Sequence, residues 1–339
     1  MLLLRGHDRP SAQFPMNRRL LIRSMAALSC AAMTGLSRAS HATEVTGSSR
    51  EALLLRDHPL VGLVWDNATG RKASQAMVVE RLARARFRLL GEVHDNVEHH
   101  RLQAELLEAL TKSGLKPMVA FEQMDRKHDA ALQQRLARGD VSAEDVARAV
   151  SFDRRGWNWA FYEPLVAIAL RDGLHLRAAN LSRSAAAPIA RSGAGALEPA
   201  RITALRLEAA WTVEREQAMR EIIRDSHCGA LPESAVPTMV WAQRARDATL
   251  AESLRVDASP DGAVLIAGNG HVRRDLGVPI YLAAADAGVS CSIGLLEVQA
   301  HQPTPQDYLT AATSAGPLYD FVWFTPRVAR PDPCAAFRK

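Results

Sequence analysis

The sequence predicts an α/β protein: a mainly parallel sheet flanked by helices, with an α-helical insertion over about residues 182–260 that caps one end of the sheet. Three observations lead to this fold class. Short apolar runs alternate with long helical patterns, which is typical of an α/β domain. Several of the runs, such as "MVAF" and "AVLIAG", are apolar throughout, as expected of parallel strands covered on both faces. About 80 residues between Leu181 and Asp261 contain no convincing strand.

The expected strands are short and rich in aliphatic residues, and most are followed by a glycine or a polar residue. In chain order they are Val61–Trp65, Arg86–Gly91, Pro117–Phe121, Leu174–Asn180, Ala263–Gly268, Ile280–Leu282, Ser292–Val298 and Phe321–Phe324.

The expected helices fill the gaps between the strands. They are Ser74–Ala85, Val97–Ser113, Gln123–Leu136, Ala143–Ala149 and Pro164–Asp172. The last is bracketed by Pro164, which suits a first helical turn, and by Gly173 just past its end. Asp95 or Asn96 is the expected N-cap of the second. In the insertion, residues 202–226 and 234–256 read as two long amphipathic helices joined by "HCGALPE".

The N-terminus resembles an export signal of the twin-arginine type. Met16 is the expected start, Arg18 and Arg19 form the arginine pair, and an apolar stretch too short to span a membrane leads to a small-x-small pattern ending at Ala42. We therefore expect residues 1–42 to be an export signal, residues 43–339 to form one domain, and the protein to face the periplasm. Cleavage near Ala42 is favoured, and lipidation at Cys30, which would anchor the protein to the membrane, is the alternative.

Charge and cysteine usage exclude several classes of protein. The chain has 42 Lys and Arg against 37 Asp and Glu, but its arginines are dispersed rather than massed with aromatic residues, so we expect no nucleic-acid binding. Three cysteines, Cys228, Cys291 and Cys334, follow the signal, without a C-x-x-C motif that would indicate a zinc finger, a redox site or covalent haem attachment. They allow one disulfide at most within a monomer, and the sequence leaves its pairing open.

Polar side chains follow strand after strand. Glu92 and His94 come after the second expected strand, Glu122 after the third, Asn180 after the fourth and His271 after the fifth. In an open parallel sheet, ligands bind outside the carboxyl ends of the strands, so we expect these groups to share one rim.

The chemistry of this rim allows more than one interpretation. His94, Glu122 and His271 form a two-His-plus-carboxylate set that would suit a divalent metal, and the same residues with Glu92 could perform acid–base catalysis. The alternative is that each histidine at a strand end is a hydrogen-bonding partner in ordinary packing. His99 could face the same site, whereas His100 is expected to face solvent.

A second cluster, "FDRRGWNWAFYEP", concentrates aromatic residues beside Arg154 and Arg155. Such a cluster before a helix is either a packing plug or a flat wall for a planar ligand, with Tyr162 as an oxygen ligand and the arginines for carboxylates. A third candidate is His227, at the joint between the insertion helices. Gln243 and Asp247 share one helix face, which we interpret mainly as a surface pair.

Together these segments resemble the ChaN-like, haem-binding, iron-regulated protein family. The matching pieces are "LLGEVHDNVEHH", "FEQMDR", "WNWAFYEPL", "HCGALP…AQRARD" and "IAGNGHVRRDLGVPIYL", from about residue 55 to 281. The resemblance implies haem bound at a homodimer interface, with a tyrosine on the iron. Tyr162 is the first choice and Tyr281 the second, with Arg154 or Arg155 in place of the family's propionate-binding lysine.

The wider group, similar to Tiki and TraB proteins and erythromycin esterases, implies a reaction centre built from His94, Glu122 and His271 with Glu92 beside them. The sequence therefore predicts an exported protein that binds haem or iron for uptake or handling. The alternative is a hydrolase of ester or peptide bonds, with or without a metal, and a third interpretation is a scaffold whose old active site is only structural.

Overall fold

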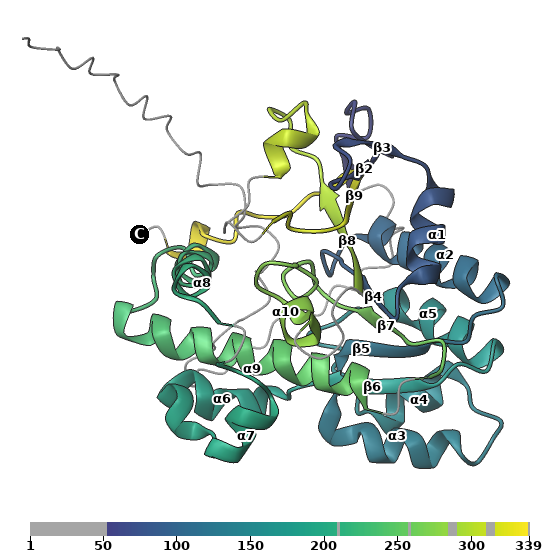
Figure 1. The fold of residues 1–339 in the computed structure, drawn as a ribbon, viewed down its shortest axis with the longest axis horizontal. Coiled ribbons are helices and arrows are strands. Elements are labelled where there is room, and N and C mark those ends of the chain that lie inside the picture. The colour runs from purple at the N-terminus through teal and green to yellow at the C-terminus, as the bar shows by residue number, and fades with distance from the viewer. Residues whose placement is uncertain (1–52, 209–210, 257–258, 284–289, 310–315, 338–339) are drawn as a thin grey trace, which may run out of the picture.

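The computed structural model describes residues 53–208, 211–256, 259–283, 290–309 and 316–337. In these residues eight strands form one sheet in the order β3-β2-β9-β8-β4-β7-β5-β6 (Figure 1). The six strands from β9 to β6 run parallel, so the mainly parallel sheet expected from the sequence is confirmed. They are β9 (Phe321–Thr325), β8 (Ser290–Glu297), β4 (Phe87–Leu90), β7 (Ala263–Ile266), β5 (Met118–Asp125) and β6 (Leu176–Asn180).

The opposite edge of the sheet is antiparallel. Strand β2 (Val64–Asp66) pairs with both β9 and β3 (Arg71–Ala73) in that sense. A separate two-stranded ladder joins β1 (Leu53–Leu54) to β10 (Arg327–Val328), which ties the start of the described chain to its end. These short strands lack a long apolar run, and β1, β3 and β10 were not expected from the sequence.

Helices cover both faces of the sheet, and alternate residues of each strand face different helices. Phe121 packs in the cluster formed with α1 (Gln75–Arg84), α2 (Val97–Lys112), α4 (Ala143–Ala149) and α5 (Trp159–Arg171). Its neighbour Ala120 packs in the cluster that contains α9 (Val236–Arg255) and α10 (Val278–Ala283). Figure 1 shows the first group of helices on the right and the second on the left. This two-sided cover explains why the central strands are apolar throughout.

The remaining helices are shorter or lie at the periphery. They are α3 (Asp129–Leu136), α6 (Arg183–Ser192), α7 (Pro199–Ala204) and α8 (Val213–Ser226), with 3₁₀ turns at Arg126–His128, Gly193–Ala196, Glu233–Ala235, Pro305–Tyr308 and Ala335–Phe337. The expected insertion is helical, but its first long helix is divided into α7 and α8. Leu205 and Leu207 are buried on either side of Arg206, whose φ of 55° is incompatible with a continuing helix.

Three sequence-based assignments were wrong. Residues 123–125 extend β5 beyond a bulge instead of beginning a helix. Residues 280–282 belong to α10 and pack their apolar side chains without strand pairing. Helix α5 begins at Trp159, capped by the Asn158 side chain, so Pro164 lies one turn inside the helix. In each case tertiary packing or a cap outweighs the local pattern.

Cys228 and Cys334 form a disulfide that joins the end of the α8 segment to the C-terminal region across 106 residues. Cys291 is a buried free thiol in β8. Among the described residues, every helix is too short or too polar to cross a membrane. The predicted signal, including Met16, the arginine pair, Cys30 and Ala42, lies outside the described residues.

A carboxylate–imidazole cleft at the ends of the parallel strands

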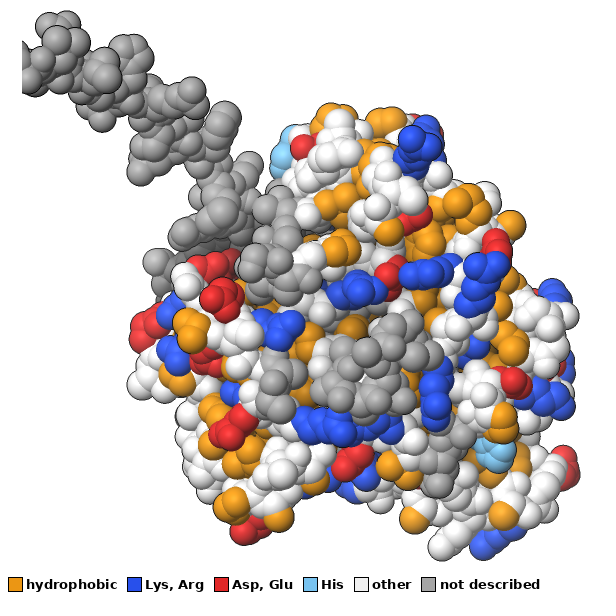
Figure 2. Space-filling view, in the orientation of Figure 1, with side chains coloured by type: hydrophobic (Ala, Val, Ile, Leu, Met, Phe, Trp, Pro, Cys, Tyr) orange, Lys and Arg blue, Asp and Glu red, His pale blue; other side chains and the backbone are white. Residues whose placement is uncertain are grey.

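Lys and Arg side chains are spread among other side chains over the face of the molecule shown in Figure 2. Beneath the surface, Glu92 is a fully buried carboxylate at the end of β4, and several polar side chains converge on it. Its Oε1 lies 2.7 Å from His94 Nδ1 and accepts hydrogen bonds from the Tyr162 hydroxyl at 2.7 Å and from Gln123 Nε2 at 2.9 Å. Its Oε2 accepts from Gln103 Nε2 at 3.0 Å. Burial alone would raise the pKa of Glu92, but the neighbouring histidines and the hydrogen bonds lower it below its ordinary value. Glu92 is therefore a fixed buried anion.

His94 is the imidazole that Glu92 orients. Its Nδ1 is engaged with the carboxylate, and its ring meets Trp157 edge-on at 4.5 Å between ring centroids. The other side of the ring lies against Gly268: a Cβ added there would be 2.8 Å from Cε1 and 3.1 Å from Nε2, so only glycine allows this approach. Burial would lower the pKa of His94, but the bond to Glu92 and the charges of Glu122 and Glu92 raise it. His94 Nε2 has no hydrogen-bond partner among the described residues.

His271 is held on both sides by carboxylates. Its Nδ1 lies 2.6 Å from Asp247 Oδ1, and its Nε2 lies 3.1 Å from Glu122 Oε1. Glu122 is itself fixed, because its Oε2 accepts the backbone N–H of Gly268 at 2.7 Å. Burial would lower the pKa of His271, but the two carboxylates raise it to about 10. His271 is therefore an imidazolium at neutral pH.

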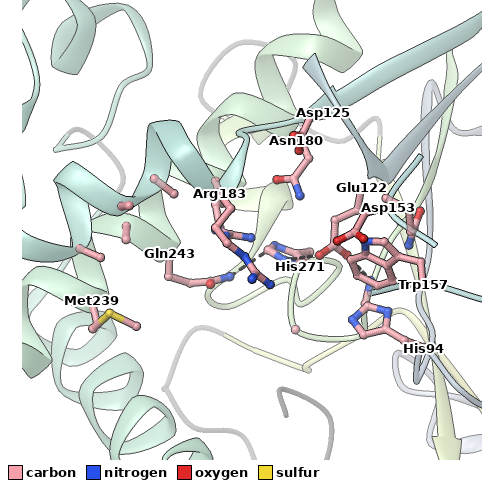
Figure 3. Close-up of a pocket in the computed structure, with 18 of the residues that line it drawn as sticks. His94, Glu122, Asp125, Asp153, Trp157, Asn180, Arg183, Met239, Gln243 and His271 are labelled. Carbon is pink, nitrogen blue, oxygen red and sulfur yellow. Dashed lines mark hydrogen bonds and ion pairs between the residues drawn. The ribbon is translucent and has the colours of Figure 1, made fainter. Parts of the chain in front are cut away.

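The structure brings His94, Glu122 and His271 to one cavity of about 230 Å³ (Figure 3). Trp157 lies beside His94 at one end, and α6 and α9 of the insertion supply the opposite wall. Because the residues come from the ends of β4, β5 and β7, the parallel topology accounts for their convergence.

His99 and His100, which follow His94 in the sequence, do not line the cavity. His99 accepts from the backbone of Val93 and bonds to Thr325 Oγ1 at 2.7 Å, so it lies between β4 and β9 and does not line the cavity. The expectation that His100 faces solvent was wrong: it is 4% exposed, stacks on Phe161 and bonds through Nε2 to the His94 carbonyl at 3.0 Å. Burial lowers the pKa of both imidazoles.

The aromatic segment at residues 152–164 takes both roles expected of it, as a packing plug and as a wall of the cavity. Phe152, Trp159 and Tyr162 are buried and pack on one another, as a plug would. Trp157 is half-buried and lines the cavity, as a wall would. The Tyr162 hydroxyl is committed to Glu92, and burial raises its pKa well above the ordinary value.

The other candidate cofactor ligands lie outside the cavity lining. Arg154 is exposed, pairs with Glu144 at 2.6 Å and lies over the Trp159 ring, while Arg155 is exposed. His227 bonds through Nδ1 to the Ile223 carbonyl at 2.8 Å, at the end of its own helix. Tyr281 is 1% exposed, and burial raises its pKa. None of these four residues lines the cavity.

The three residues predicted to bind a metal, His94, Glu122 and His271, are not arranged as a shared set of ligands. Glu122 and His271 bond to each other rather than facing a shared point, and His94 Nδ1 is taken by Glu92. Within the part of the chain that the structure describes, no group of three His, Cys, Asp or Glu residues is placed to hold a metal ion. The expectation of a divalent metal at these residues finds no support in this geometry.

Sequence reasoning missed several residues of the cleft. Asp247 is fully buried and holds His271, rather than forming the surface pair that was expected. Its i,i+4 partner Gln243 lies 3.3 Å from both Asp247 Oδ2 and His271 Nδ1, and that spacing was the only signal. Arg183 and Arg246 also line the cavity, and only the insertion's position above the strand ends could have indicated them.

The chain belongs to the family described as haem-binding uptake, Tiki superfamily, ChaN, whose model matches residues 78–282. This haem-binding family was the one expected from the sequence motifs. The matched range contains all of the cavity residues named above.

Solved structures share the fold. A structure titled "Cofacial heme binding to ChaN of Campylobacter jejuni" is 22% identical, with a TM-score of 0.60, and the match covers 77% of this chain and 95% of that one. A mutant of the erythromycin esterase EreC, in its open conformation, is 13% identical with a TM-score of 0.37, covering 75% of this chain and 79% of that one. A Bacillus cereus protein is 10% identical with a TM-score of 0.41, covering 76% and 79%. A search of curated proteins gave no match.

Proposed function

We propose that this chain is an exported protein that binds haem for uptake or handling, and that His94 is the residue that meets the iron. The observation that carries the proposal is the state of His94 at the cavity. Its Nδ1 is fixed by Glu92, while its Nε2 has no partner among the described residues. A histidine whose second nitrogen bonds a carboxylate is the usual form of an imidazole metal ligand, because the carboxylate fixes the tautomer and raises the basicity of the free nitrogen.

The described residues offer the His94 imidazole, and not a tyrosine, as the side chain that would bind the haem iron. The phenols of Tyr162, Tyr281 and Tyr319 are buried, and that of Tyr308 bonds to the backbone at Gln299 and Gln302. His94 keeps 22% of its side chain exposed and has the flat indole of Trp157 beside it. When bound, haem would supply an iron that can take a nitrogen ligand such as this imidazole. The cavity, about 230 Å³, is below the usual size for drug-sized ligands, so it would not enclose a porphyrin.

Export is supported by the signal-like N-terminus and by the disulfide. Cys228 and Cys334 pair although no redox motif accompanies them, and structural disulfides persist mainly outside the reducing cytosol. The intact mass of protein recovered from its native compartment tests this directly. A mature chain that begins after Ala42 or at a lipidated Cys30 supports export, and a full-length chain contradicts it.

Haem titration followed by the Soret band tests the role of His94. The wild-type protein should give a saturable shift, His94→Ala should weaken binding by at least about 10-fold, and His227→Ala should bind as wild type because His227 lies outside the cavity. Equal binding by wild type and His94→Ala would remove His94 from the proposal. Absence of binding by the wild type would contradict haem binding itself.

A second candidate function is hydrolysis. It is favoured by one feature of the cleft that haem binding would not need. The cleft places an imidazole with an open nitrogen opposite a buried imidazolium, His271, that two carboxylates hold. Such a pair could take a proton from water at His94 and stabilise negative charge near His271. Turnover of a chromogenic ester that is lost in both His94→Ala and Glu92→Gln, but kept in His227→Ala, would support hydrolysis. Turnover unchanged by His94→Ala would contradict it.

A further inference from the structure

The wall of the cavity opposite His94 carries two arginines that make no direct polar contact with the described residues. Arg183, from the start of α6, and Arg246, from α9, both line the cavity, and Figure 3 shows Arg183 extending toward His271. Neither guanidinium makes a hydrogen bond or ion pair with any residue that the structure describes. Arg183 is exposed, whereas Arg246 is half-buried, and burial lowers its pKa. An arginine stays charged in proteins, so two cations that no described side chain binds directly face the same space.

The carboxylates that line the same cavity are already engaged. Glu122 bonds to His271 and to the Gly268 N–H. Asp153 accepts the backbone N–H groups of residues 155 and 156, and Asp125 lies 3.5 Å from the Lys127 ammonium. Among the described residues, none of these carboxylates is hydrogen-bonded to Arg183 or Arg246, so both guanidiniums can still pair with an anionic ligand.

Two hydrogen-bond acceptors in the lining also lack donors. Gln123 and Asn180 are 5% and 6% exposed, and Gln123 Oε1 and Asn180 Oδ1 are buried without a partner among the described residues. The orientation of Gln123 is set by Glu92, because Nε2 donates to that carboxylate. A buried acceptor without a donor is unfavourable by about 1–3 kcal/mol. A ligand that brings an O–H or N–H group would remove this deficit.

The rest of the lining limits the size of the ligand. Small side chains of α6 and α9 line the cavity without filling it: Ala186, Ala187, Ala190 and Ala242. The volume of about 230 Å³ accommodates a molecule of few heavy atoms.

We propose that this cavity binds a small carboxylate that carries a hydroxyl or N–H donor next to the carboxyl group, with Arg183 and Arg246 on the carboxylate and Asn180 and Gln123 accepting from the donor. This site goes beyond haem binding and does not depend on it, since the arginines that bind the carboxylate lie on the wall opposite His94. A hydroxycarboxylate is the simplest ligand of this chemistry.

The test uses three matched probes with the mature protein: L-lactate has both groups, propionate lacks the donor, and lactamide lacks the charge. Isothermal titration or ligand-observed NMR should show lactate binding at least about 10-fold more tightly than either of the others, as expected for a charge-assisted contact plus one satisfied acceptor. Arg183→Gln should weaken lactate binding at least about 5-fold, and so should Arg246→Gln. Arg154→Gln, which removes an exposed arginine outside the cavity, should leave it unchanged.

Two results would overturn the proposal. One is lactate binding no better than lactamide. The other is an unchanged lactate affinity in Arg183→Gln, a variant expected to fold because Arg183 is exposed. Haem propionates share the carboxylate chemistry, so a parallel titration compares haem with its dimethyl ester. Suppose that the arginine variants weaken the binding of haem but not of its dimethyl ester, and that lactate does not bind. The two arginines then bind haem propionates, and the proposed small-carboxylate site is wrong.

Discussion

The two histidines of the cleft show how the same side chain is given different properties by its neighbours. His94 has one carboxylate, Glu92, on Nδ1 and keeps Nε2 open, with part of its ring exposed. His271 has a carboxylate on each nitrogen, and its pKa is raised to about 10. The first can bind a metal centre or exchange a proton, whereas the second is a fixed cation. Both histidines stand three residues after a glycine, Gly91 or Gly268, so the number of carboxylates around each ring, rather than this shared spacing, decides its role.

The largest expected effect comes from removing the buried carboxylate that orients His94. Glu92→Ala leaves His94, Tyr162 and Gln123 without their common partner, so the free energy of unfolding should fall by about 3–5 kcal/mol. Denaturant unfolding measures it. Glu80→Ala, which removes an exposed partner of Arg84, is the control and should change stability by less than about 0.5 kcal/mol. A loss below about 1 kcal/mol for Glu92→Ala would show that the network is not structural.

Removing the disulfide should destabilise the fold without changing either histidine. The paired variant Cys228→Ser with Cys334→Ser opens a loop of 106 residues, which should lower the free energy of unfolding by about 2–5 kcal/mol. Because neither cysteine lines the cavity, haem and lactate titrations of the folded variant should match those of wild type. Altered binding in the folded variant would show that the C-terminal region influences the cleft.

The charge on His271 should appear in the pH dependence of stability. Its pKa is about 10 in the folded protein against an ordinary value of 6.5, so the stabilising contribution is full below pH 6.5 and is lost as the pH rises toward 10. Wild-type stability should therefore fall by about 2–4 kcal/mol more than that of His271→Gln between pH 7 and pH 10. Thermal unfolding across this range measures the difference. Parallel curves for the two proteins would mean that His271 is neutral.

The smallest expected effect concerns Trp157. Its edge contact with His94 should contribute about 0.5–1.5 kcal/mol, and Trp157→Leu should lose that amount while Trp157→Phe keeps most of it. Denaturant unfolding of the two variants gives the comparison. An equal loss in both would mean that bulk, rather than the aromatic edge, matters.

The sequence allowed the sheet and the convergence of its polar ends to be predicted, because long apolar runs and parallel topology determine both. Gly268 illustrates what local pattern predicts well: a glycine after a strand, where the structure needs close approach to His94. Asp247 illustrates what it does not, because its burial depends on how α9 docks over the sheet. His100 likewise follows a polar run, yet tertiary packing buries it against Phe161. The cysteine pairing and the arginine pair also depend on three-dimensional proximity.

The most direct test of the contrast between the two histidines is a pH titration of histidine-labelled protein by ¹H–¹⁵N NMR, with His94→Ala and His271→Gln used to assign the signals. We expect His271 to carry protons on both nitrogens at pH 8 and to lose one only near pH 10. We expect neutral His94 to keep its proton on Nδ1, toward Glu92, and to leave Nε2 unprotonated. A neutral His271 at pH 8, or a neutral His94 protonated on Nε2, would contradict this contrast.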